Sequence, residues 1–188
     1  MAGRTPAEAV QNFLGPLQQA ISCVTRTVLV SSGYHPRQDE EPHLLTLGES
    51  PARLNSNPRL FLSVTMHYHV VEAPGERGPW KVSIAAYLYS LDDEQGQEIL
   101  AFHWHPRGRS SVTSPHLHIG PGAGVQYQQL QGAHIPTGRV ALEDVLRLAI
   151  RELGVRPLRR DWADILDRTQ RAFEQWRTWP APDHPLGP

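Results

Sequence analysis

The chain has 188 residues, of which 39% are hydrophobic, and its 18 basic and 19 acidic residues give a formal net charge of −1. This length suits a single domain with a substantial core, and the near-neutral charge argues against a generally basic binder of nucleic acids. The single cysteine, Cys23, excludes an internal disulfide and a cysteine-based zinc site.

A helix is predicted over residues 5–29. Thr5 followed by Pro6 is typical of an N-cap and a first-turn proline, and apolar residues then recur at spacings of three and four. Because Pro16 lacks a backbone N–H, we expect it to kink or split this helix. Residues 31–58 are rich in Ser, Pro, Asp, Glu and Asn and are interpreted as a loop with one short strand at 43–47.

Four strands are predicted between residues 60 and 120. In the first strand apolar residues alternate with polar ones, among them His67 and His69. The alternation of the second strand places Lys81, Tyr87 and Tyr89 on the same face as these histidines. The last two strands contain two more His-x-His pairs, which are His103 with His105 and His116 with His118.

Two further helices are predicted at 140–153 and 161–177, followed by a flexible tail at 179–188. Consecutive strands flanked by helices favour an α+β fold. We therefore expect one domain over residues 1–178, with an antiparallel four-stranded meander and helices packed on one face.

Short connections allow the strand pairing to be estimated from the turn centres. This places the paired histidines in two rows on the open face of the sheet, with the residue between each pair anchored in the core. The expected rows are His69, Ser83, His105 and His116, and His67, Ala85, His103 and His118. A register shift of two residues would preserve the faces. His134 joins this group only if its loop folds back.

One use of these rows is metal binding. Neighbouring strands lie roughly 4.8 Å apart, so imidazoles on adjacent strands can meet at one ion. Three of the four histidines His103, His105, His116 and His118 could hold zinc or another divalent transition metal, which leaves one position for water. The carboxylates that usually orient such imidazoles are not evident on these strands.

A second use is acid–base chemistry on a phosphodiester. Histidine titrates near neutrality, so one neutral and one protonated imidazole can act as base and acid, with His116 and His118 at the centre and His103 or His105 as their partner. Lys81, Arg107 and Arg109 could bind a phosphate, while Tyr87 and Tyr89 could stack a base. His67 and His69 would then contribute to substrate binding. There are two alternatives. The histidines could form a polar sheet face with no catalytic role, or the protein could be a non-catalytic adaptor that binds a protein partner.

Between about residues 97 and 156, the segments "ILAFHWH", "SPHLHIG" and "RVALEDVLRLAIREL" resemble the TumE-type toxins of bacterial toxin–antitoxin systems. The matching positions are His116, His118, Ile119 and Gly120. The extra histidine pairs and the first and last helices depart from that pattern. The resemblance implies a bacterial protein with a cognate antitoxin and an action on RNA, as in a ribonuclease-type hydrolase. No leader or membrane segment is evident, so a cytoplasmic protein is expected.

Overall fold

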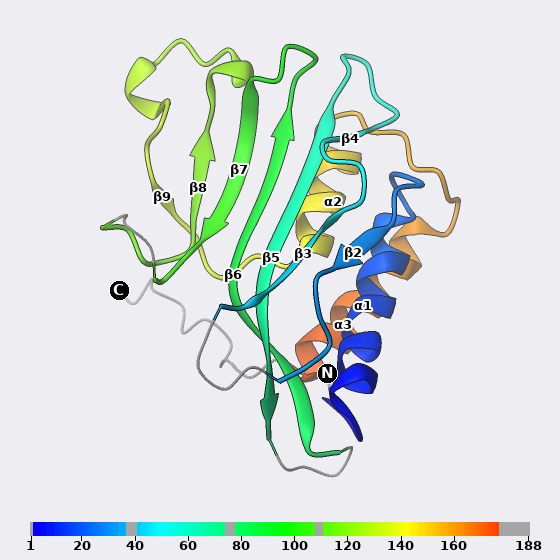
Figure 1. The fold of residues 1–188 in the computed structure, drawn as a ribbon. Helices are drawn as coiled ribbons and strands as arrows, with labels where there is room; N and C mark the ends of the chain where they lie inside the picture. The colour runs from blue at the N-terminus through cyan, green and yellow to red at the C-terminus, as the bar shows by residue number, and fades with distance from the viewer. Residues whose placement is uncertain (1, 37–40, 74–77, 108–110, 177–188) are drawn as a thin grey trace, which may run out of the picture.

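A computed structural model of the chain describes residues 2–36, 41–73, 78–107 and 111–176 (Figure 1). It confirms the α+β class: an antiparallel sheet is packed against three helices. The elements are β1 (Ala2–Gly3), α1 (Pro6–Ile21), β2 (Leu29–Ser31), β3 (His43–Leu47), β4 (Ala52–Arg53), β5 (Phe61–Glu72), β6 (Trp80–Asp92), β7 (Glu98–Trp104), β8 (His116–Ile119), the 3-10 turns η1 (Pro121–Ala123) and η2 (Gln128–Leu130), β9 (Ile135–Pro136), α2 (Leu142–Arg151) and α3 (Trp162–Trp176).

The sheet is larger than the predicted four-stranded meander. The expected meander is present as β5–β6–β7–β8, but the sheet continues on both sides in the order β2–β3–β5–β6–β7–β8–β9, with β1 on β6 and β4 on β5. The loop predicted over residues 31–58 contains a strand that was not expected, because Ala52 and Arg53 form β4 and pair with β5. The short strand predicted at 43–47 is confirmed as β3.

Helix α1 begins as predicted but ends early. The Thr5 side chain accepts a hydrogen bond from the backbone N–H of Glu8, which caps the helix, and Pro6 occupies its first turn. The helix continues through Pro16 without splitting and ends at Ile21 instead of residue 29. Ser22 forms the C-cap, after which the chain turns to enter β2.

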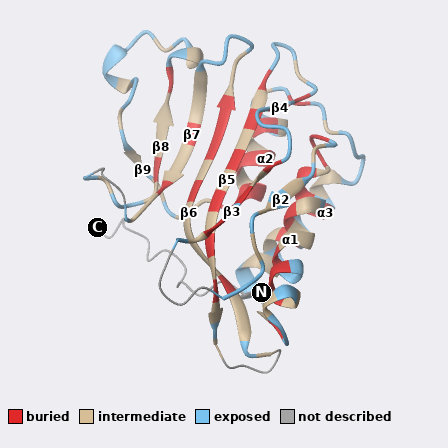
Figure 2. Ribbon diagram, in the orientation of Figure 1, coloured by how far each residue is buried: buried red, intermediate tan, exposed pale blue. Residues whose placement is uncertain are grey.

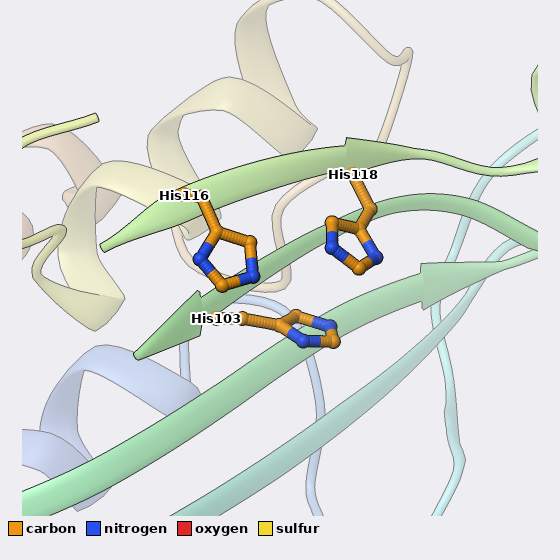
Figure 3. A group of neighbouring side chains, drawn as sticks. All are labelled: His103, His116 and His118. Atoms are coloured by element: carbon orange, nitrogen blue, oxygen red, sulfur yellow. The ribbon is translucent and has the colours of Figure 1, made fainter. Parts of the chain in front are cut away.

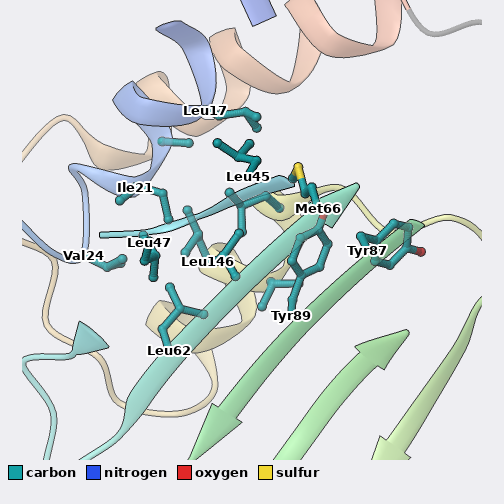
Figure 4. Packing of buried hydrophobic residues seen from close by; sticks show 14 of the residues in the cluster. Leu17, Ile21, Val24, Leu45, Leu47, Leu62, Met66, Tyr87, Tyr89 and Leu146 are labelled. Atoms are coloured by element: carbon teal, nitrogen blue, oxygen red, sulfur yellow. The ribbon is translucent and has the colours of Figure 1, made fainter. Parts of the chain in front are cut away.

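The hydrophobic core lies between the helices and one face of β3, β5 and β6 (Figure 4). Leu62, Val64, Met66 and Tyr68 alternate along β5 with partly exposed residues, as the sequence pattern predicts. Figure 2 shows this part of the sheet in red, together with the inner surfaces of α1 and α2.

A β-bulge changes which residues of β6 face the core. His67 lies opposite Ala86 while Tyr68 lies opposite Ile84, so Ala85 is an extra residue on β6. An extra residue reverses the alternation beyond it. Tyr87, Tyr89 and Leu91 are consequently buried in the core, and the expectation that both tyrosines share the histidine face is wrong.

Helices α2 and α3 confirm the two predicted C-terminal helices to within two residues wherever their ends are described. The Arg147 guanidinium on α2 joins them, since it bonds Asp167 and Gln170 of α3. In the described part of the chain, no helix is both long enough and apolar enough to cross a membrane. The predicted tail at 179–188 lies outside the described residues.

Candidate metal centre

Five histidine side chains meet on the β7–β8 part of the sheet. We call them the histidine cluster: His103, His105, His116, His118 and His134. Ring centroids in contacting pairs are separated by 4.4 Å for His103–His118 and by 5.9 Å for His103–His105. His116 contacts all four of the others and is therefore the centre of the cluster.

The register of β7 on β8 brings these rings together. His103 lies opposite His116, and His118 lies opposite Ala101, two residues away from the predicted pairing of His103 with His118. The pairing of β6 with β7 is shifted as well, because Leu88 and not Ala85 lies opposite His103. The hairpin turn spans Asp93 to Gln97, which is further along the chain than the turn centre predicted near residue 94.

His134 enters the cluster because β9 pairs with β8. Leu117 lies opposite Ile135 and His116 opposite Pro136, and continuing this register places His134 beside His118. The ring centroids of His134 and His118 are 4.6 Å apart. The condition set for His134 from the sequence is thus fulfilled, since its loop does fold back. The two residues of β9 carry too little pattern to predict the pairing.

Three members of the cluster have the geometry of a metal site. His103, His116 and His118 each offer a ring nitrogen, and these three nitrogens lie within 4.8 Å of one another. Figure 3 shows the three rings converging from β7 and β8. Zinc–nitrogen bonds of about 2.0–2.1 Å in a tetrahedral site imply nitrogens about 3.3 Å apart. Modest side-chain rotations would therefore bring all three onto one ion.

The tautomer of His116 is fixed by its backbone surroundings. Its Nδ1 lies 2.8 Å from the carbonyl oxygen of Ser114, and a carbonyl can only accept, so Nδ1 carries the proton. The lone pair is then on Nε2, which is buried without a hydrogen-bond partner in a side chain that is 1% exposed. A backbone carbonyl can orient a ligating imidazole as a carboxylate does, which supplies the group that the sequence lacked.

Three other ring nitrogens of the cluster are also buried without a partner: Nε2 of His103, Nδ1 of His105 and Nε2 of His118. A buried polar atom without a partner costs about 1–3 kcal/mol. Four such atoms within one group of contacting rings favour a shared partner that accepts several lone pairs at once. A metal cation is such a partner.

Burial lowers the pKa of two of these imidazoles. It is the main cause that lowers the pKa of His103 to about 4, and the neighbouring imidazoles, His118 foremost, lower it further. Burial likewise lowers the pKa of His118, followed by the effect of His134. Neutral imidazole is the form that binds metals, so both rings can ligate an ion at neutral pH without first losing a proton.

A glycine allows β8 to lie close to β7. The backbone N–H of Gly120 donates to the carbonyl of Ile99 over 3.0 Å, and a Cβ at position 120 would lie 2.1 Å from the carbonyl oxygen of Glu98. Only glycine fits this approach. The "HIG" segment thus contains both a histidine of the cluster and the glycine that allows β8 to pack closely against β7.

His67, His69 and Lys81 lie apart from the cluster. His67 and His69 are on the same sheet face, where His67 pairs with Ala86 and His69 with Ser83, but their rings are not among the ring contacts of the described residues. Lys81 pairs with Val71, seven residues along β6 from Leu88, which puts it roughly 20 Å from the cluster.

Among the residues expected to bind phosphate or stack a base, Arg107 affects His69, and the two tyrosines lie in the core. Burial, followed by the charge of Arg107, lowers the pKa of His69, so Arg107 acts electrostatically on His69. Arg109 lies outside the described residues. Tyr87 and Tyr89 stack on each other in the core, with ring centroids 4.8 Å apart, and cannot stack a base on the histidine face.

Comparison with known proteins adds no family to these observations. No protein-family model, no curated protein and no solved structure matches this chain. The similarity to TumE-type toxins therefore stays a prediction from a short motif, and the function has to be inferred from the histidine cluster itself.

Proposed function

We propose that this protein binds a divalent transition metal of the late first row through His103, His116 and His118. Two observations carry the proposal. One ring nitrogen from each of the three imidazoles lies within 4.8 Å of the other two, and each of these rings has a buried nitrogen without a hydrogen-bond partner. An all-imidazole site favours zinc, copper, nickel or cobalt over magnesium and calcium, which prefer oxygen ligands.

The test compares two His-x-His pairs that share a motif and a sheet face. Untagged protein should bind about one zinc ion per chain by isothermal titration and elemental analysis. A zinc concentration of roughly 100 times Kd should add about 2.7 kcal/mol of stability, which raises Tm by roughly 5–10 °C. The variant carrying His116→Ala and His118→Ala should lose both effects.

The matched control carries His67→Ala and His69→Ala, which removes the same number of imidazoles from the same face. It should bind zinc as the natural protein does, because neither ring contacts the cluster. Equal binding by both variants, or no binding by the natural protein, would overturn the proposal.

Metal-free cleavage of RNA is the second hypothesis, and the effect of the Arg107 charge on His69 favours it, since an imidazole and a guanidinium that act on each other can bind a phosphodiester together. The low pKa of His103 suits a base but leaves that ring unprotonated, so a second group would have to act as the acid. RNA degradation that persists in a chelator and is lost on His103→Ala would support this hypothesis. This hypothesis also includes a cognate antitoxin as the binding partner of the protein.

A further inference from the structure

His134 differs from the three proposed ligands in where it is attached. It is exposed and stands just before the two-residue strand β9, at the end of an irregular segment, residues 121–134, that includes η1 and η2. Its ring nevertheless contacts two of the proposed ligands, with centroids 4.8 Å from His116 and 4.6 Å from His118. An exposed ring on a loop can rotate toward the same centre more easily than a buried one.

His105 is the competing candidate for a fourth ligand. It follows the last residue of β7, and its ring contacts His103 and His116 at 5.9 and 5.7 Å. Both distances exceed those of His134 to its two neighbours. A tetrahedral ion on His103, His116 and His118 has one remaining position, and the closer ring is better placed to occupy it.

The segment that carries His134 packs against β7 at η1, where a Cβ at Gly122 would lie 2.6 Å from the carbonyl oxygen of Gln97, but the residues after η1 have few other attachments to the sheet. The backbone of Gly132 donates to Ile119 at 3.4 Å, β9 pairs with β8 at only two positions, and Thr137 donates to the carbonyl of Pro115. Several of its side chains are exposed, including Tyr127 at 62%. A metal–imidazole bond would therefore be a strong additional attachment.

We propose that His134 supplies the fourth ligand, so that metal binding closes the coordination sphere and fastens residues 121–136 to the sheet. The inference rests on the proposed function. Four imidazoles leave no position for an activated water, which makes the site one for holding or sensing a metal. Metal binding would then make residues 121–136 more ordered.

The experiment uses the full chain with zinc or cobalt(II) as the probe and compares His134→Ala with the matched variant His105→Ala. X-ray absorption should count four imidazoles on zinc in the natural protein and in His105→Ala, but three plus an oxygen ligand in His134→Ala. The cobalt(II) visible spectrum should change in His134→Ala alone. Zinc affinity should fall roughly tenfold or more there, since even groups that only orient a ligand contribute that much.

Hydrogen exchange of residues 121–136 provides an independent measurement. Zinc should slow exchange in this segment in the natural protein and in His105→Ala, and should leave it unchanged in His134→Ala. The inference is overturned if His105→Ala loses the fourth imidazole, or if His134→Ala keeps four ligands and the slowed exchange. If the natural protein binds no metal at all, the proposed function fails instead, which separates the two outcomes.

Discussion

The two halves of the sheet have different surroundings. The half formed by β3, β5 and β6 is covered by α1 and α2 and contains most of the fully buried side chains (Figure 2). The half formed by β7, β8 and β9 extends beyond the helices (Figure 1) and has mostly intermediate and exposed residues. The histidine cluster belongs to this second half.

The difference indicates that one half of the sheet provides most of the stability, while the other half carries the candidate site. In the helix-covered half most buried side chains are apolar, and the Tyr68 hydroxyl is hydrogen-bonded. In the other half Ala101 and Trp104 are buried, but four contacting imidazoles also have buried ring nitrogens without a partner. Such burial contributes little to folding by itself, and it leaves lone pairs available for a ligand. Three predictions test this division, the largest effect first.

The largest expected effect is the loss of stability on Tyr89→Ala. Tyr89 is 2% exposed and stacks on Tyr87, so its truncation should lower the free energy of unfolding by about 3–5 kcal/mol. His118→Ala should change it by about 1 kcal/mol or less in the presence of a chelator. Urea denaturation at pH 7.5 measures both. A cost for His118→Ala equal to that of Tyr89→Ala would show that the second half stabilises the fold as much as the first.

The second effect is a dependence of stability on pH that originates in the histidine cluster. The pKa of His103 is about 4 in the folded chain, compared with 6.5 as its ordinary value. Between these pH values the unfolded chain binds a proton that the folded chain does not, so stability falls as pH falls from 6.5 toward 4. Above pH 6.5 this contribution is absent.

The size of this pH effect is limited by solvent, because the His103 ring is only partly buried. Between pH 7.5 and 4.5, the free energy of unfolding should fall by about 1–2 kcal/mol more in the natural protein than in His103→Gln, a value that allows for screening by solvent. Urea denaturation at the two pH values measures this difference. Comparing the two proteins cancels the titration of shared carboxylates. An equal loss in both would contradict a depressed pKa at this position.

The smallest effect tests the β-bulge that reverses the alternation of side chains along β6. Beyond Ala85, Leu88 faces the histidine side opposite His103, while Tyr87 and Tyr89 face the core. Leu88→Thr should therefore cost about 1 kcal/mol or less, as expected away from the core. Uninterrupted alternation would instead place Leu88 in the core, where truncation costs about 2–5 kcal/mol. A cost in that range would contradict the bulge.

The sequence by itself determined the fold class, the helix starts, the four central strands and the face on which the His-x-His pairs lie. These properties follow from local physics: N-cap chemistry begins α1 at Thr5 and Pro6, and the two-residue period of β5 separates His67 and His69 from the core. They require no knowledge of how strands pair.

Only the tertiary structure decided which histidines meet. The extra residue at Ala85 and the later hairpin turn changed the partners of β6, and a two-residue shift of β8 placed His103 opposite His116. Shifts of two residues preserve every face, so alternation cannot distinguish them. The choice depends on long-range contacts such as the close approach of Gly120 to β7 and the pairing of β9 that brings in His134, and these exist only once the sheet is assembled.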